Sequence, residues 1–447
     1  MTVPPAATPA ETGWFGHPRG LSTLFFTEMW ERFSYYGMRG FLILYLTAAV
    51  ASGGLGFDDK QGAHVYALYT SSVWLTPILG GFIADRFLGQ YRSVLIGGII
   101  IALGHFTLAF HALPFFYTGL ALIVVGTGLL KPNVSTLVGS LYEANDRRRD
   151  AGFSVFYMGI NIGAFLGITG AGALAEKVDW HLGFAAAGVG MTLGLIQYVL
   201  GEKRLQLAID RLATRPRETG PAATATPTRA SLTVADWKRI AAIFVLFIFA
   251  ALFWGAYEQA GSTLNLFADR YTDREVFGWV IPASWLQAVQ PIFVILLAPV
   301  MAWLWVRLGH REPSSPAKFA LALLFAGLAF LLLVPAASLA QSGAGVKVSP
   351  LWLVLAYAIE ELGELCLSPV GLSAVTKLAP PRLVGRMMGV FFLSNWLGNL
   401  LAGWTAGFFS SMPLPTLFGV VAGVSLGAAA IMFVLIKPVR NLMGGVH

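Results

Sequence analysis

Long apolar runs, each separated from the next by a short polar segment, occupy most of this 447-residue chain. A helix needs about 20 apolar residues to cross the hydrocarbon core of a bilayer. Within this core every backbone N–H and C=O group must be hydrogen-bonded inside the protein, which a helix achieves and an irregular open chain does not. Only 12% of the residues are charged, about half the share found in soluble domains. The sequence therefore predicts an all-α integral membrane protein with twelve transmembrane helices, near residues 21–50, 64–88, 91–111, 115–141, 151–175, 182–201, 238–268, 280–308, 317–339, 350–378, 385–410 and 415–436.

One polar segment differs from the others in length and composition. Residues 202–236 are rich in Arg, Thr, Pro and Ala, which is typical of a flexible linker. The segment divides the spans into six before it and six after it, and it is too short and polar to contain an extra inserted helix pair. We therefore expect a cytoplasmic lead (1–20), an N-terminal six-helix bundle (21–201), a cytoplasmic linker (202–236), a C-terminal six-helix bundle (237–437) and a cytoplasmic tail (438–447).

The basic residues are distributed unevenly about these spans. With both termini in the cytoplasm, 22 of the 30 Lys and Arg residues fall in inner segments and 5 in outer loops. This asymmetry follows the positive-inside rule and predicts a multi-pass protein of the plasma (inner) membrane with cytoplasmic ends. Because the inner segments account for the net charge of +7, that charge does not indicate nucleic-acid binding. Residues 1–20 lack the apolar core of a signal peptide.

The first predicted span carries its charges on one face. Glu28, Glu31, Arg32, Tyr35 and Arg39 fall within an arc of about 100° on a helix of 3.6 residues per turn. A charged side chain at the centre of a span costs roughly 2.5–3.5 kcal/mol. Such residues persist where they have partners and face a hydrated cavity. The charged face therefore favours a membrane protein that moves a polar solute.

Several motifs resemble those of the proton-coupled oligopeptide transporter (POT/PTR) family of the major facilitator superfamily. Residues 28–37, EMWERFSYYG, match the ExxERFxYY motif of that family. Further matches lie at residues 130–133, 156–161, 258–263, 364–369 and 392–395. The resemblance implies two six-helix bundles with a substrate site near the membrane midplane.

The resemblance also implies a function and a set of site residues. It implies a symporter that imports di- and tripeptides by alternating access, is driven by the proton gradient without a cofactor, contains no metal and works as a monomer in the lipid bilayer. Peptide contacts are expected from Arg32, Tyr35, Tyr36, Arg39, Trp74, Lys131, Asn161, Trp254, Gln290, Glu364, Phe391 and Asn395, proton coupling from Glu28, Glu31, Arg32 and Glu258, and gating from the pairs Arg39–Glu258 and Lys131–Glu364. Trp74, Gln290 and Phe391 stand where relatives often carry Tyr, Asn and Trp, so side-chain preference is expected to differ.

The charges expected in the spans also suit a peptide on chemical grounds. A zwitterionic peptide needs a cation for its carboxylate and an anion for its ammonium group. Arg39 and Lys131 in the N-terminal half and Glu258 and Glu364 in the C-terminal half supply both. Burial disfavours the charged form of a carboxyl and a nearby cation favours it. Breaking an Arg39–Glu258 pair would therefore link proton uptake to the opening of a gate.

Other classes of function are less well supported. The sequence contains no HExxH, GxSxG or P-loop motif, so an enzyme is not expected. One cysteine, Cys366, excludes an intramolecular disulfide and, with seven scattered histidines, disfavours a metal site. Charges of both signs, rather than a ring of one sign, disfavour a channel. A proton-coupled carrier of another small solute, such as nitrate or an amino-acid-like compound, remains the alternative.

Overall fold

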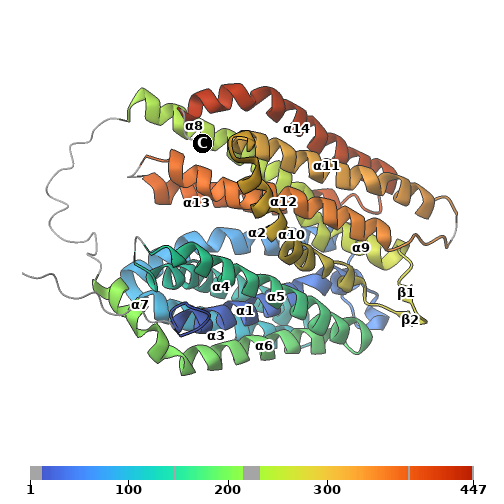
Figure 1. The fold of residues 1–447 in the computed structure, drawn as a ribbon. Helices are drawn as coiled ribbons and strands as arrows, with labels where there is room; N and C mark the ends of the chain where they lie inside the picture. Colours follow the sequence, from blue (N-terminus) through green and yellow to red (C-terminus); the bar gives the residue numbers. More distant parts are fainter. Residues whose placement is uncertain (1–12, 144–145, 215–231, 344, 381–382, 445–447) are drawn as a thin grey trace, which may run out of the picture. The chain divides into compact units, whose positions relative to one another are not determined.

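The structure is a computed structural model that describes residues 13–143, 146–214, 232–343, 345–380 and 383–444. Parts of the predicted lead, linker and tail, at 1–12, 215–231 and 445–447, lie outside the described residues. The remainder is almost entirely helical (Figure 1). The helices are α1 (Gly20–Thr47), α2 (Asp59–Ile83), α3 (Gln90–Leu108), α4 (Leu113–Ser140), α5 (Arg148–Lys177), α6 (Trp180–Leu200), α7 (Glu202–Thr214), α8 (Val234–Tyr257), α9 (Thr263–Tyr271), α10 (Val289–Leu308), α11 (Ser315–Ala340), α12 (Leu351–Leu378), α13 (Val384–Ala406) and α14 (Leu414–Met443).

Most of these helices have the length and apolar character of membrane spans. Within the described residues, nine helical segments are long and apolar enough to cross a bilayer. Three further helices, α1, α12 and α13, have 28, 28 and 23 residues. Two of them, α1 and α12, carry buried ionisable side chains, which lower their mean hydropathy. The structure thus confirms the prediction of a multi-pass, all-α membrane protein.

Short strands occur between α9 and α10. In this part of the described chain, β1 (Glu275–Val276) and β2 (Trp279–Val280) pair antiparallel. The two residues that connect them, Phe277 and Gly278, have φ of 52° and 79°. Two positive φ values in a two-residue loop match the twist of a tight hairpin.

The predicted seventh span is not one continuous helix. The apolar run at 238–268 predicted a single helix, but α8 ends at Tyr257 and a 3₁₀ turn, η4 (Glu258–Gly261), separates it from α9. Ser262 follows with φ −127° and ψ −90°, which is not helical. Apolar periodicity does not reveal such a break, because the residues on both sides are equally buried. The break places Glu258 at a point where the helical backbone is interrupted.

The predicted linker also begins with ordered structure. Residues 202–214 form the amphipathic helix α7, not a flexible segment, with Leu205 and Ala208 fully buried. The helix packs against α4. Apolar residues three and four positions apart make one face of a helix, and the high charge of this segment masked that spacing in the sequence.

Contacts between residues group the chain into two compact units, which are described separately. Unit 1 falls within residues 1–35, 76–164 and 185–226, and unit 2 within 36–75, 165–184 and 227–447. The boundaries cut through α1, α2, α5 and α6, so one end of each of these helices belongs to each unit. The division of the sequence into two successive six-helix bundles stays a prediction.

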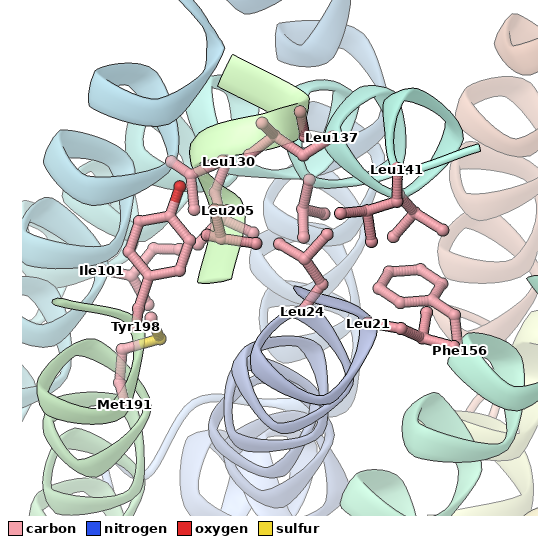
Figure 2. Close-up of a cluster of buried hydrophobic side chains, with 14 of the residues drawn as sticks. Leu21, Leu24, Ile101, Leu130, Leu137, Leu141, Phe156, Met191, Tyr198 and Leu205 are labelled. Atoms are coloured by element: carbon pink, nitrogen blue, oxygen red, sulfur yellow. The ribbon is translucent and has the colours of Figure 1, made fainter. Parts of the chain in front are cut away.

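The core of unit 1 joins its helices through large apolar side chains. Figure 2 shows Leu21 and Leu24 of α1 beside Leu137 and Leu141, with Leu205 of α7 next to them. Each of these five side chains is at most 3% exposed. The cluster therefore attaches α7 to the end of α1 as well as to α4.

Unit 2 combines the seven helices α8–α14 with the ends of α1, α2, α5 and α6. Close approach of α1 and α5 requires glycine, because a Cβ at Gly37 would lie 2.9 Å from the carbonyl oxygen of Gly167. The carbonyl of Gly40 on α1 accepts hydrogen bonds from Asn265 Nδ2 at 2.7 Å and from Gln287 Nε2 at 3.2 Å. Segments that are more than 220 residues apart in the sequence are thus joined through the α1 backbone.

Candidate functional site

Three ionisable residues on α1 form a buried cluster in unit 1. The Arg32 guanidinium forms an ion pair with Glu28, in which Arg32 Nε lies 3.1 Å from Glu28 Oε1, and it also contacts the Glu31 carboxylate. All three residues are at most 4% exposed. Arg32 also lies over the ring of Tyr35, at 5.3 Å from its centroid. Two ionised carboxylates and one guanidinium carry a net charge of −1. Binding of one proton to either carboxylate brings the net charge of the cluster to zero.

Lys131 lies in the same unit, in the middle of α4. It is half-buried, precedes Pro132, and is within electrostatic reach of Glu28. Asn161 on α5 is 7% exposed and donates through Nδ2 to the carbonyl of Tyr157 at 3.0 Å. Unit 1 therefore contains a cation on α4 and an amide on α5 among the predicted peptide-binding residues.

Arg39 is held in unit 2 by groups from three elements. It forms an ion pair with Glu258 through Nη2, and its Nε donates to the Tyr66 hydroxyl at 2.8 Å. The rings of Tyr36 and Tyr66 each lie 5.9 Å from the guanidinium carbon. A guanidinium that stacks on aromatic rings while it donates from its edge has a well-defined orientation.

The break between α8 and α9 explains how Glu258 reaches Arg39. A Cβ at Gly261 would lie 1.8 Å from the Tyr66 hydroxyl oxygen and 3.3 Å from Arg39 Nε. Only glycine fits there, so the η4 backbone can approach the arginine closely. The structure thus brings together the two members of the first predicted gating pair, while the gating role itself stays a prediction.

A second acidic cluster lies on α12. Glu360 and Glu361 are fully buried and Glu364 is 6% exposed. The Tyr257 hydroxyl donates to Glu361 Oε1 at 2.9 Å. Glu364 and Lys131 belong to different units, so the second predicted gating pair stays a prediction.

The other predicted peptide-binding residues of unit 2 are aromatic or amide side chains on several helices. Trp254 makes edge contacts with Phe253 and Tyr257, at centroid distances of 5.3 Å each. Phe391 is 3% exposed and packs against Phe319 at 6.5 Å. The amide Asn395 is buried, whereas Tyr36, Trp74 and Gln290 are half-buried.

Sequence reasoning missed a polar network that joins helix ends in unit 2. Asp59, at the start of α2, accepts bidentate hydrogen bonds from Arg270 at 2.6 and 2.7 Å and another from the Ser410 hydroxyl. The side chain of Asp59 is 7% exposed and that of Arg270 is 34% exposed. The sequence shows only that both residues lie in loops or near the ends of predicted spans, which does not identify partners more than 200 positions apart.

Glu176 makes a comparable connection at the end of α5. Its carboxylate accepts hydrogen bonds from the backbone N–H groups of Ala283 at 2.6 Å and Ser284 at 3.0 Å, and it lies 3.7 Å from Arg274 Nη1. Trp285 Nε1 donates to the carbonyl of Thr169 at 2.9 Å. These bonds attach α5 to the segment before α10.

Comparison with known proteins supplies the family. The model of the POT family matches residues 91–209 and 214–420. The uncharacterised transporter YclF of Bacillus subtilis is 40% identical, covering 98% of this chain and 97% of its own. The peptide transporter YePEPT of Yersinia enterocolitica is 38% identical with the same coverage. A crystal structure of a peptide transporter POT in complex with sulfate superimposes with a TM-score of 0.90 at 40% identity, covering 98% of both chains. The chain therefore belongs to the POT family of transporters.

Proposed function

We propose that this protein is a proton-coupled symporter that imports di- and tripeptides. Relatives named as peptide transporters align over nearly the whole chain. The observation that carries the proposal is the buried Arg39–Glu258 pair, in which a cation suited to a peptide carboxylate is neutralised by a titratable acid. Protonation of that acid would free the arginine for substrate.

The proposed cycle starts with a proton entering from outside. Protonated Glu258 no longer pairs with Arg39, which then binds the peptide carboxylate together with Lys131. Glu364 accepts the peptide ammonium group, while Asn161 and Gln290 contact the peptide backbone. The other predicted contacts are Arg32, Tyr35, Tyr36, Trp74, Trp254, Phe391 and Asn395.

The cluster of Glu28, Glu31 and Arg32 is proposed as a second proton-handling group. Its two carboxyls share one guanidinium, so gaining or losing one proton changes the buried charge by one unit. A peptide that brings its own carboxylate near Lys131 alters the same balance. This provides a physical route by which substrate and proton binding influence one another.

Alternating access requires one end of the molecule to close while the other is open. In unit 2, the ends of α1, α2 and α5 are bonded to η4, α9 and the segment before α10. The positive-inside rule assigns this end to the outer side. We propose that these contacts form an outer gate that must break before peptide can enter from outside.

The same proposal includes the finer architecture. All of α1–α6 and α8–α14 would contribute to twelve spans, with α8 and α9 together forming one of them and no extra helix pair between the halves. Both termini would lie in the cytoplasm, and the protein would work as a monomer of the plasma membrane. It would need no cofactor or metal and catalyse no chemical reaction.

Uptake by proteoliposomes tests the proposal. Labelled dialanine should accumulate above its external concentration when an inward acid gradient is imposed, and unlabelled tripeptides, but not nitrate, should compete. Competition by nitrate with no effect of peptides would instead support the carrier of another solute. Equal uptake with and without the gradient would refute proton coupling.

The variant Glu258→Gln tests the proposed proton site. A glutamine cannot take up and release the proton, so gradient-driven accumulation should be lost. Exchange of labelled for unlabelled peptide should continue, because exchange needs no net proton movement. Full accumulation by this variant would show that Glu258 is not the coupling residue.

A further inference from the structure

A cavity of about 760 Å³ lies at the end of unit 2 that carries the proposed outer gate. Arg270 and Tyr271 at the end of α9 line it, together with Lys347 and with Ser410 and Ser411, which follow α13. Its volume is in the range of sites for small molecules. The lining also includes apolar side chains, so one ligand can place both a polar and an apolar part there.

Hydrogen bonds between segments hold the lining of this cavity in place. Lys347 precedes Val348, whose backbone N–H donates to the carbonyl of Tyr271 at 2.9 Å. This bond attaches the segment before α12 to the end of α9. The Leu414 N–H donates to Gln341 Oε1 at 3.0 Å, which attaches the start of α14 to the end of α11. The cavity is therefore built from connected helix ends.

Both charged side chains in the lining are cations. Arg270 and Lys347 contribute them, and the described lining residues include no Asp or Glu. Asp59 engages one N–H on each Nη atom of Arg270, which leaves the remaining guanidinium N–H groups to donate elsewhere. The Arg270 side chain is 34% exposed. Because a carboxylate accepts strong hydrogen bonds from guanidinium and ammonium groups, the lining favours a ligand with a carboxylate.

A second cavity beside Arg270 has a different charge pattern. Arg270 also lines this cavity, which has a volume of about 260 Å³ and includes the acids Glu176 and Asp269. Arg274 Nη1 lies 3.7 Å from Glu176 Oε2, and Arg274 Nη2 lies 2.9 Å from Asp269 Oδ1. Acids and bases compensate one another there, so the smaller cavity does not favour an anionic ligand.

We propose that the larger cavity is a docking site where the carboxylate of a short peptide binds from the outer side before the gate opens. This inference rests on the proposed function, which makes the peptide the substrate and this end of unit 2 the outer gate. Lys347 attracts the peptide carboxylate, and the free N–H groups of Arg270 and the hydroxyl of Ser411 bind it. Arg270 keeps its bonds to Asp59, so docking takes place while the gate is closed. The site raises the concentration of peptide beside the gate.

Protection of a cysteine from labelling tests this site in protein purified in detergent. Ser411→Cys in a Cys366→Ser background places a thiol in the cavity lining, and dialanine should slow its reaction with a maleimide. Dialanine amide lacks the carboxylate and should not protect the thiol. Lys347→Gln should raise the dialanine concentration for half-maximal protection about fivefold, the effect of a solvent-accessible ion pair. The matched control Lys60→Gln, at an exposed lysine outside the lining, should leave that concentration unchanged.

Three results of this experiment would overturn the docking site. They are an unshifted half-protecting concentration in Lys347→Gln, equal protection by dialanine amide, and equal protection by inorganic phosphate. Uptake by proteoliposomes gives a second measurement, in which Lys347→Gln should raise the half-saturating dialanine concentration about fivefold without changing the maximal rate. A lower maximal rate with an unchanged half-saturating concentration would also overturn it.

Failure of the docking site and failure of the proposed function can be told apart. Cysteine protection is measured without a membrane gradient and does not require transport. Wild-type protein that shows this protection but no gradient-driven uptake refutes the proposed function. Gradient-driven uptake without this protection refutes the docking site alone.

Discussion

Removing the carboxylate of Asp59 should weaken the proposed outer gate. Asp59→Asn abolishes the bidentate ion pair with Arg270 and its acceptor for Ser410. Truncating one member of a buried, hydrogen-bonded charge pair costs about 2–5 kcal/mol. Because the Arg270 side chain is 34% exposed, water can partly replace its lost partner. We therefore expect about 2 kcal/mol, or roughly a 30-fold shift of the equilibrium toward an open gate.

The accessibility of a buried cysteine measures this shift. Ser284 is fully buried in the bonded end of unit 2, so Ser284→Cys in a Cys366→Ser background should react slowly with a membrane-impermeant maleimide. Adding Asp59→Asn should raise the labelling rate about 30-fold if labelling follows the open population. The control is Asp58→Asn, because Asp58 caps α2 through the Gln61 N–H at 2.7 Å and asparagine caps equally well. Equal labelling of the two variants would refute the assignment of Asp59 to the gate.

Three further variants test the local structure of the site and of α7. Gly261→Ala should lower peptide uptake at least tenfold, because the added methyl would lie 1.8 Å from the Tyr66 hydroxyl oxygen. Combining Gly261→Ala with Tyr66→Phe removes that oxygen and should recover part of the uptake. A double variant without any recovery would contradict this steric explanation. Arg39→Lys keeps the charge but loses the forked geometry that serves Glu258 and Tyr66 together, so uptake should fall at least tenfold, and wild-type kinetics would show that charge alone suffices. Leu205→Ala should destabilise unit 1 by about 2–5 kcal/mol and lower the midpoint of thermal unfolding in detergent. The control Leu207→Ala, at a 40% exposed position of α7, should change this midpoint little. Equal midpoints for the two variants would mean that α7 does not stabilise the unit.

The fold class and family could be predicted from the sequence because their signals are local. Apolar length specifies a membrane helix wherever it occurs, since the bilayer imposes the same requirement on every span. The motif at residues 28–37 places Glu28, Glu31 and Arg32 on one helical face. The Glu28–Arg32 ion pair follows from the spacing alone, because residues four apart are neighbours on a helix.

Other features could not be predicted because their signals were masked. The apolar run at 238–268 hides the η4 break, since the residues on both sides of it are buried equally well. The charges of α7 hide an apolar face that exists only against α1 and α4. In both cases the local structure depends on packing against another helix, and the periodicity of apolar residues carries no information about that packing.

What the sequence determined by itself is therefore the all-helical, multi-pass fold class, the family and the kinds of charge that the membrane must tolerate. Only the tertiary structure decided which charges outside the recognised motifs meet. It joined Asp59 to Arg270, and Glu176 to the backbone before α10. The physical reason is that an ion pair or a buried acid depends on distance and burial, and both are set by packing between segments that lie far apart along the chain.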